Sequence, residues 1–129
     1  MLTLLLLLSV AAATAPADVR VTHSHLVVTC VDGQRVDGKT RQWHPSRLMS
    51  LTFTMRNEPR PGVAKHEPGI AVISFSPEVN HRYEIETRAD VESYSTRVWK
   101  QGEWKPVVRD RTTDAIVSSE PRWIERGCS

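Results

Sequence analysis

Helical patterns, aromatic residues and catalytic signatures are all scarce in this sequence. Aromatic residues make up 6% of the 129 residues, and no stretch repeats apolar residues at the i, i+3, i+4, i+7 spacing of an amphipathic helix. The P-loop, dinucleotide-binding, metalloprotease and nucleophile-elbow signatures are missing. The formal net charge is +2, and the arginines are spread along the chain without a basic block. These absences argue against a helical fold, a dedicated nucleic-acid binder and an enzyme of those classes.

Only one long apolar run occurs, and it stands at the N-terminus. Residues 1–15 carry five consecutive leucines, no charge, and the small residues Ala13-Thr14-Ala15 at their end. A short apolar core followed by such an A-x-A sequence is typical of a secretory signal peptide. No later run approaches the ~18–20 residues that a transmembrane helix needs. We therefore expect residues 1–15 to be removed, leaving residues 16–129 as a single periplasmic or secreted domain without a transmembrane segment.

Cysteine is rare, so only one intramolecular disulfide is possible. The chain contains only Cys30 and Cys128. In an oxidising compartment two cysteines are expected to form a structural disulfide, although a reactive thiol is the alternative. The bond would close a loop of about 98 residues, for which chain entropy gives a stabilisation on the order of 4–5 kcal/mol.

The composition after the first fifteen residues predicts an all-β fold. This region has 14 Val, 5 Ile and 9 Thr, but only 3 Leu. β-Branched residues fit a pleated sheet and lose rotamer freedom in helices. Short runs at strand-like spacing are separated by Pro and Gly. We expect a small antiparallel β-sandwich of about seven strands with one disulfide, and the alternative is a partly closed β-barrel.

Alternation of apolar and polar residues places the strands. In residues 48–56, Met49, Leu51 and Phe53 share one face while the intervening residues are polar, as in a half-buried antiparallel strand. Asp32-Gly33 supplies the chemistry of a tight turn. The expected strands are residues 18–31, 48–56, 70–76, 81–89, 93–100, 103–109 and 114–118.

A tryptophan pair is the first candidate binding feature. If Gln101-Gly102 forms a two-residue turn, Trp99 lies opposite Trp104. Together with Arg97 on the same face, the two indoles would form a patch for an unknown envelope protein or glycan. The alternative is that such indoles fill the core, and we expect at least one of the two to be largely buried.

Two histidines form the candidate metal site. His23 and His25 are two residues apart, so in a strand both imidazoles would project from one face and could approach one zinc or copper ion. Another histidine could supply a third ligand. No other cofactor is expected.

The polar loop 57–69 is longer than most connections and is either functional or mobile.

The residues between Gly69 and Ser118 carry a family resemblance. An apolar strand ends in Phe75, and the turn after it leads into the sequence HRYE at residues 81–84; a V-x-D-x-x-T-x-x-x-V element follows from Val108 to Val117. This pattern resembles small exported bacterial envelope proteins of unassigned function. The resemblance implies a β-sandwich of the bacterial envelope and assigns no functional residue.

These observations lead to one functional expectation with alternatives. We expect an exported, non-enzymatic β-sandwich that serves as a binding or accessory module of the bacterial cell envelope. The alternatives are a periplasmic inhibitor of an envelope enzyme and a metal-handling protein that uses His23 and His25. A small hydrolase is the least expected.

Overall fold

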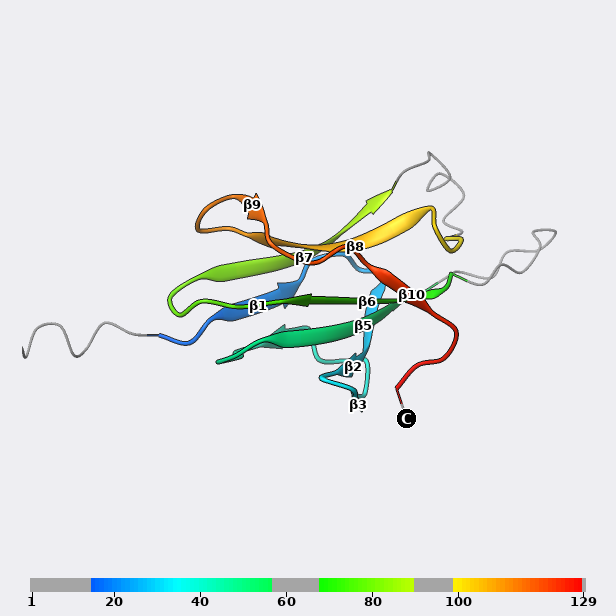
Figure 1. Cartoon of the computed structure of the whole chain (residues 1–129), viewed down its shortest axis with the longest axis horizontal. Helices are drawn as coiled ribbons and strands as arrows, with labels where there is room; N and C mark the ends of the chain where they lie inside the picture. The colour runs from blue at the N-terminus through cyan, green and yellow to red at the C-terminus, as the bar shows by residue number, and fades with distance from the viewer. Residues whose placement is uncertain (1–14, 57–67, 90–98, 129) are drawn as a thin grey trace, which may run out of the picture.

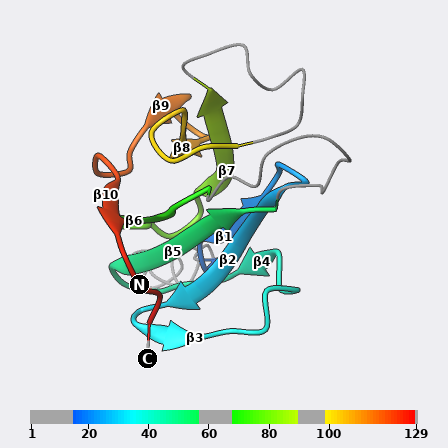
Figure 2. The ribbon, with the colours of Figure 1, turned by 90° about the vertical axis from the view of Figure 1, so that its right-hand side faces the viewer.

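Two five-stranded sheets pack face to face (Figures 1 and 2). The computed structural model describes residues 15–56, 68–89 and 99–128, and these ranges contain ten strands and no helix. The two sheets remain separate, so the predicted sandwich is confirmed and the partly closed barrel is not formed. The strand count exceeds seven because several strands are only two or three residues long.

The first sheet has the order β4-β1-β7-β8-β9. Its only parallel pair is β1 with β7, and the other pairs are antiparallel. In β7 the side chains of Tyr83 and Ile85 are buried, whereas the charged residues between them face outward, as the alternation predicts. The strands are β4 (Gln42–Trp43), β1 (Asp18–Val21), β7 (Arg82–Ala89), β8 (Trp104–Asp110) and β9 (Ala115–Ile116).

The second sheet has the order β10-β6-β5-β2-β3 and is antiparallel throughout. Its β2–β3 hairpin turns at Asp32-Gly33, where both residues have positive φ (50° and 80°), as a type I′ turn requires. The strands are β10 (Arg122–Ile124), β6 (Ile70–Phe75), β5 (Met49–Met55), β2 (Leu26–Val31) and β3 (Gln34–Arg35).

The single strand expected over residues 18–31 is wrong. The chain leaves β1 after Val21, turns through residues 22–25, and enters the other sheet as β2 at Leu26. Val21 and Leu26 both point into the core although they are five positions apart. Side chains of a continuous strand alternate with period two, so these two positions could not share a face without a break.

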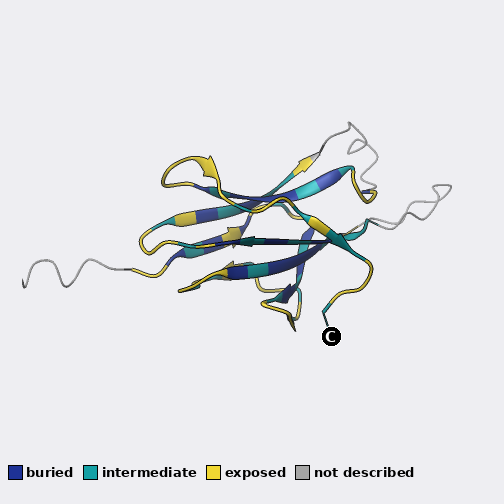
Figure 3. Ribbon diagram, viewed as in Figure 1, coloured by how far each residue is buried: buried dark blue, intermediate teal, exposed yellow. Residues whose placement is uncertain are grey.

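The core lies between the sheets and is filled from both of them (Figure 3). On β5, the alternation expected at Met49, Leu51, Phe53 and Met55 is confirmed, because all four are buried. The short strands β3, β4 and β10 were not expected. They are too short to show an alternating pattern in the sequence. They form because their backbones pair with the exposed edges of β2, β1 and β6.

A β-bulge in β2 decides where the disulfide lies. Val28 pairs with Phe53, and Cys30 pairs with Thr52, so Thr29 and Cys30 together oppose one residue of β5. The extra residue shifts the alternation, and Cys30 faces outward with Thr52 instead of into the core. Cys128 meets it there, with the two Cα atoms 6.1 Å apart, which confirms the predicted disulfide.

Candidate functional site

The outer faces of the two sheets differ in chemistry. On the first sheet, Arg109 pairs with Glu86 at 2.7 Å and Arg111 with Glu84 at 3.6 Å, which makes a solvated ladder of charges. The middle strands of the second sheet present threonine, serine, valine and isoleucine on their outer face. The lack of charge on these middle strands is unusual for a solvated sheet face, and for this reason we searched the second sheet for a binding site.

An apolar row crosses this outer face. Val27 of β2 lies opposite Thr54 of β5, and Ile70 of β6 lies opposite Ile124 of β10. Thr54 and Ile70 are adjacent, because the neighbouring residues on the same strands, Phe53 and Ala71, are paired. The Thr54 hydroxyl donates to the Gly69 carbonyl at 2.9 Å, so its methyl group is the part that lies beside Val27 and Ile70. We call these four outward residues, Val27, Thr54, Ile70 and Ile124, the apolar row.

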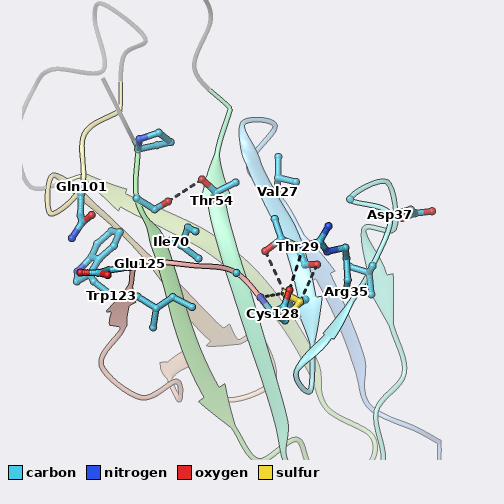
Figure 4. Close-up of a pocket in the computed structure, with 17 residues that line it drawn as sticks. Val27, Thr29, Arg35, Asp37, Thr54, Ile70, Gln101, Trp123, Glu125 and Cys128 are labelled. Carbon is cyan, nitrogen blue, oxygen red and sulfur yellow. Dashed lines mark hydrogen bonds between the residues drawn. A yellow bond between two sulfur atoms is a disulfide. The ribbon is translucent and has the colours of Figure 1, made fainter. Parts of the chain in front are cut away.

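The C-terminal segment makes one wall beside this row. Glu125–Cys128, here called the strap, leaves β10 and crosses the outer face to the disulfide at Cys30 (Figure 4). Arg35 of β3 donates from Nη2 to the Cys128 carbonyl at 3.3 Å, and the Cys128 amide approaches the Cys30 sulfur at 3.2 Å. The strap is therefore fixed at both ends, by the β10 ladder and by the covalent bond.

The apolar row and the strap enclose a groove of about 940 Å³. Gln101 and Trp123 lie at the end nearest β10, and Arg35 lies at the end nearest β3 (Figure 4). Gly69, with φ of +85°, lies so close to Gln101 that an added Cβ would come within 2.8 Å of it. A larger residue at this position would be strained and would displace Gln101.

Three charged side chains, Arg35, Asp37 and Glu125, line the groove. Arg35 has a carbonyl as its partner in the described structure. The Asp37 carboxylate points away in Figure 4 and accepts the backbone N–H groups of Lys39 (2.8 Å) and Thr40 (3.3 Å). These bonds hold the pKa of Asp37 below its usual value. Glu125 lies at the side opposite Arg35 (Figure 4).

The predicted tryptophan patch is not exposed. Trp99 and Trp104 retain 6% and 1% of their accessible surface, so the expectation that at least one indole is buried is confirmed, and these two side chains do not form an exposed patch. The Trp104 indole donates to the Pro68 carbonyl at 2.7 Å and meets Trp123 edge to face at 5.0 Å. Arg97 lies outside the described residues, as do residues 57–67 of the long loop.

The turn expected between the tryptophans is present. Glu103 donates to the Lys100 carbonyl at 3.1 Å, and Gly102 has φ of +88°, as a tight turn at Gln101-Gly102 requires. Trp99 belongs to no described strand, and Trp104 pairs with Ala89 of β7. Residues 93–98 of the expected strand 93–100 lie outside the described residues.

The two candidate metal ligands lie in a turn instead of a strand. The His23 and His25 ring centroids are 5.8 Å apart, and His23 Nδ1 accepts the His25 backbone N–H at 3.2 Å. Burial, followed by the charges of His25 and Arg41, lowers the pKa of His23. Across the described part of the chain, no group of three His, Cys, Asp or Glu side chains is placed to hold a metal ion. Zinc or copper binding at this pair remains a prediction.

A carboxylate–histidine cluster is the feature that the sequence did not reveal. His81 Nδ1 lies 2.7 Å from the buried Asp110, and its Nε2 lies 3.2 Å from Glu78. The hydrogen bond to Asp110 raises the pKa of His81. Burial works to raise the pKa of Asp110, but bonds from His81 and the Thr112 amide outweigh it and lower that pKa. Spacing gives no signal for this cluster, because the β7–β8 pairing brings residues 29 apart together.

Both ring nitrogens of His81 have a carboxylate partner in this cluster. A catalytic histidine uses one nitrogen to bind an orienting carboxylate and keeps the other for the reacting group. Here Glu78 occupies the second nitrogen of His81.

Comparison with family models, curated proteins and solved structures gave no match to this chain.

Proposed function

We propose that this protein is an exported, non-enzymatic binding module of the bacterial cell envelope whose ligand occupies the groove beside the strap. The groove carries the proposal, because its volume of about 940 Å³ combines an apolar floor with a few polar groups. Binding sites for small molecules are typically concave, mainly apolar and ~300–1,000 Å³ in volume. The wall is covalently fixed, so little ordering is needed when a ligand binds.

The chemistry of the groove favours binding over reaction. The hydroxyls of Thr29 and Thr54 donate to backbone carbonyls at 3.3 and 2.9 Å, and so they are engaged in holding the walls. Nucleophilic catalysis needs a hydroxyl or thiol paired with a base. The sulfur atoms at the groove are joined in the disulfide.

Export is supported by two independent features of the chain. The uncharged, leucine-rich residues 1–15 have the form of a signal peptide. The disulfide is compatible with an oxidising compartment. Mass spectrometry of the protein from its native host should show a first residue at Pro16 or Ala17. A mature, envelope-located chain that still begins with Met1 would contradict export.

Ligand retention tests the binding function. The protein is purified from the native host under native conditions and then denatured, and the released molecules are identified by mass spectrometry. Wild type should release a species that the Ile70→Glu variant lacks, because a carboxylate in the apolar row opposes an apolar ligand. Ile116→Glu on β9, at an exposed position of the other sheet, is the matched control. Equal release from all three proteins would contradict the proposal.

A further inference from the structure

The floor of the groove is long and narrow. The apolar row crosses four neighbouring strands in the order β10, β6, β5 and β2. Since neighbouring strands lie ~4.8 Å apart, the row extends for roughly 14 Å. The strap runs along one side of it (Figure 4). A linear chain can contact the whole row, whereas a compact ring would contact only part of it.

One end of the groove is cationic. Arg35 on β3 lies opposite Cys30 of β2 and lines the same groove as Val27, and one nitrogen of its guanidinium donates to the Cys128 carbonyl. A guanidinium has five N–H donors in a planar fork that matches a carboxylate. Asp37 is directed away from the groove, and Glu125 is at the far side (Figure 4). Among the described residues Arg35 makes no ion pair, so an anionic group at this end of the groove would meet its positive charge.

We propose that the groove binds a linear aliphatic carboxylate, with its chain along the apolar row and its carboxylate on Arg35. This inference rests on the proposed binding function and names the chemical class of the ligand. Burial of the apolar chain along the row supplies affinity. The charge-assisted hydrogen bond to Arg35 sets the direction in which the chain lies.

Titration of the oxidised protein with decanoate, below the concentration at which it forms micelles, tests this directly. Isothermal calorimetry should show at least tenfold tighter binding of decanoate than of decyltrimethylammonium, which has the same chain and the opposite charge. Acetate, which has the charge without the chain, should bind at least tenfold more weakly than decanoate. Equal binding of the two decyl compounds, or no binding of decanoate, would overturn the inference.

Two variants with matched controls separate the chain from the charge. Arg35→Gln should abolish the preference for decanoate over decyltrimethylammonium, whereas Arg122→Gln, which removes an exposed arginine of the same sheet outside the groove, should keep it. Ile70→Glu should weaken decanoate binding at least tenfold, and Ile116→Glu should leave it unchanged. Circular dichroism and thiol titration check that each variant is folded and oxidised. Equal effects of a variant and its control would contradict the proposed pose.

The failure of this inference can be told apart from the failure of the binding function. If wild type retains a native ligand that Ile70→Glu loses, but decanoate does not bind, the ligand class is wrong and the binding module stands. If nothing is retained and decanoate does not bind, both proposals fail.

Discussion

At the scale of single residues, Trp104 is a principal support of the core. Its indole is 1% exposed, donates to the Pro68 carbonyl and packs edge to face on Trp123. Trp104→Ala removes this packing and leaves a cavity, so the free energy of unfolding should fall by about 3–5 kcal/mol. Chemical denaturation measures the change. Leu48→Ala is the control, because Leu48 is 61% exposed and its truncation should cost less than about 0.5 kcal/mol. Similar losses in the two variants would contradict this account of the core.

The His81–Asp110 pair predicts a pH dependence of stability with a definite sign. The pKa of His81 is raised above 6.5, so its stabilisation is complete below 6.5 and is lost as the pH rises through the folded-state pKa. The pKa of Asp110 is lowered below 3.8, so its stabilisation is present above 3.8 and is lost as the pH falls through the folded-state value. The pair therefore stabilises the fold most between about pH 3.8 and pH 6.5, where both contributions are present.

The difference in unfolding free energy between wild type and His81→Gln tests this dependence. Denaturation over the range from about pH 4 to about pH 9 should give the largest difference in the acidic to near-neutral part, and a smaller difference at alkaline pH. A difference that is constant across the range, or that grows with alkalinity, would show that the ion pair does not form.

At the scale of elements, the bulge in β2 predicts that the chain tolerates the deletion of one residue, Thr29. Removing Thr29 takes out the extra residue, so Val28 and Val31 still face the core and Cys30 still faces the strap. We expect the deletion protein to fold with its disulfide oxidised, at a cost of about 1–3 kcal/mol for the lost bonds of Thr29 to Val36 and Thr52.

Deletion of Thr52, in the middle of β5, is the matched comparison for this bulge. β5 has no bulge in its pairing with β6, so removing one residue there turns the apolar set on one side of the deletion toward solvent. This protein should not fold. Thiol titration and circular dichroism report both outcomes, and a Thr29 deletion with two free thiols would contradict the assigned register.

The elements that could be predicted from the sequence are those with a pattern of their own. β5 and β7 alternate between apolar and polar residues, β6 is a continuous apolar run, and the Asp32-Gly33 turn has local chemistry. The two-residue strands have no period to detect and depend on their neighbours. The break between β1 and β2 did leave a signal, because Val21 and Leu26 cannot face the same side of one strand.

The site was less predictable than the fold for a physical reason. The apolar row consists of single residues from four strands that are distant in the sequence, and each looks like an ordinary outward residue in its own strand. Only the sheet order and the bulge bring them beside the strap. Trp99, Trp104, His23 and His25 were predicted as site residues because of their side-chain chemistry. In the structure both indoles are buried in the core and both histidines lie in a turn.

At the scale of the whole molecule, the disulfide should stabilise the fold without being part of its core. It joins residues 98 apart on the outer face of the second sheet. Replacing both Cys30 and Cys128 by serine should lower the free energy of unfolding by about 2–5 kcal/mol, because the unfolded chain gains freedom. The far-ultraviolet circular dichroism spectrum should remain that of a β protein. Unchanged stability would contradict the closure of this loop in the native protein.

The groove as the binding surface is the central claim, and amide chemical-shift mapping tests it most directly. Spectra of the isotope-labelled, oxidised protein are recorded before and after addition of the ligand fraction released from protein purified from the native host. The account predicts that the largest shifts gather along the apolar row, the strap and Arg35, while the charged outer face of β7 and β8 is unchanged. Shifts that gather on β7 and β8, or an unchanged spectrum, would contradict it.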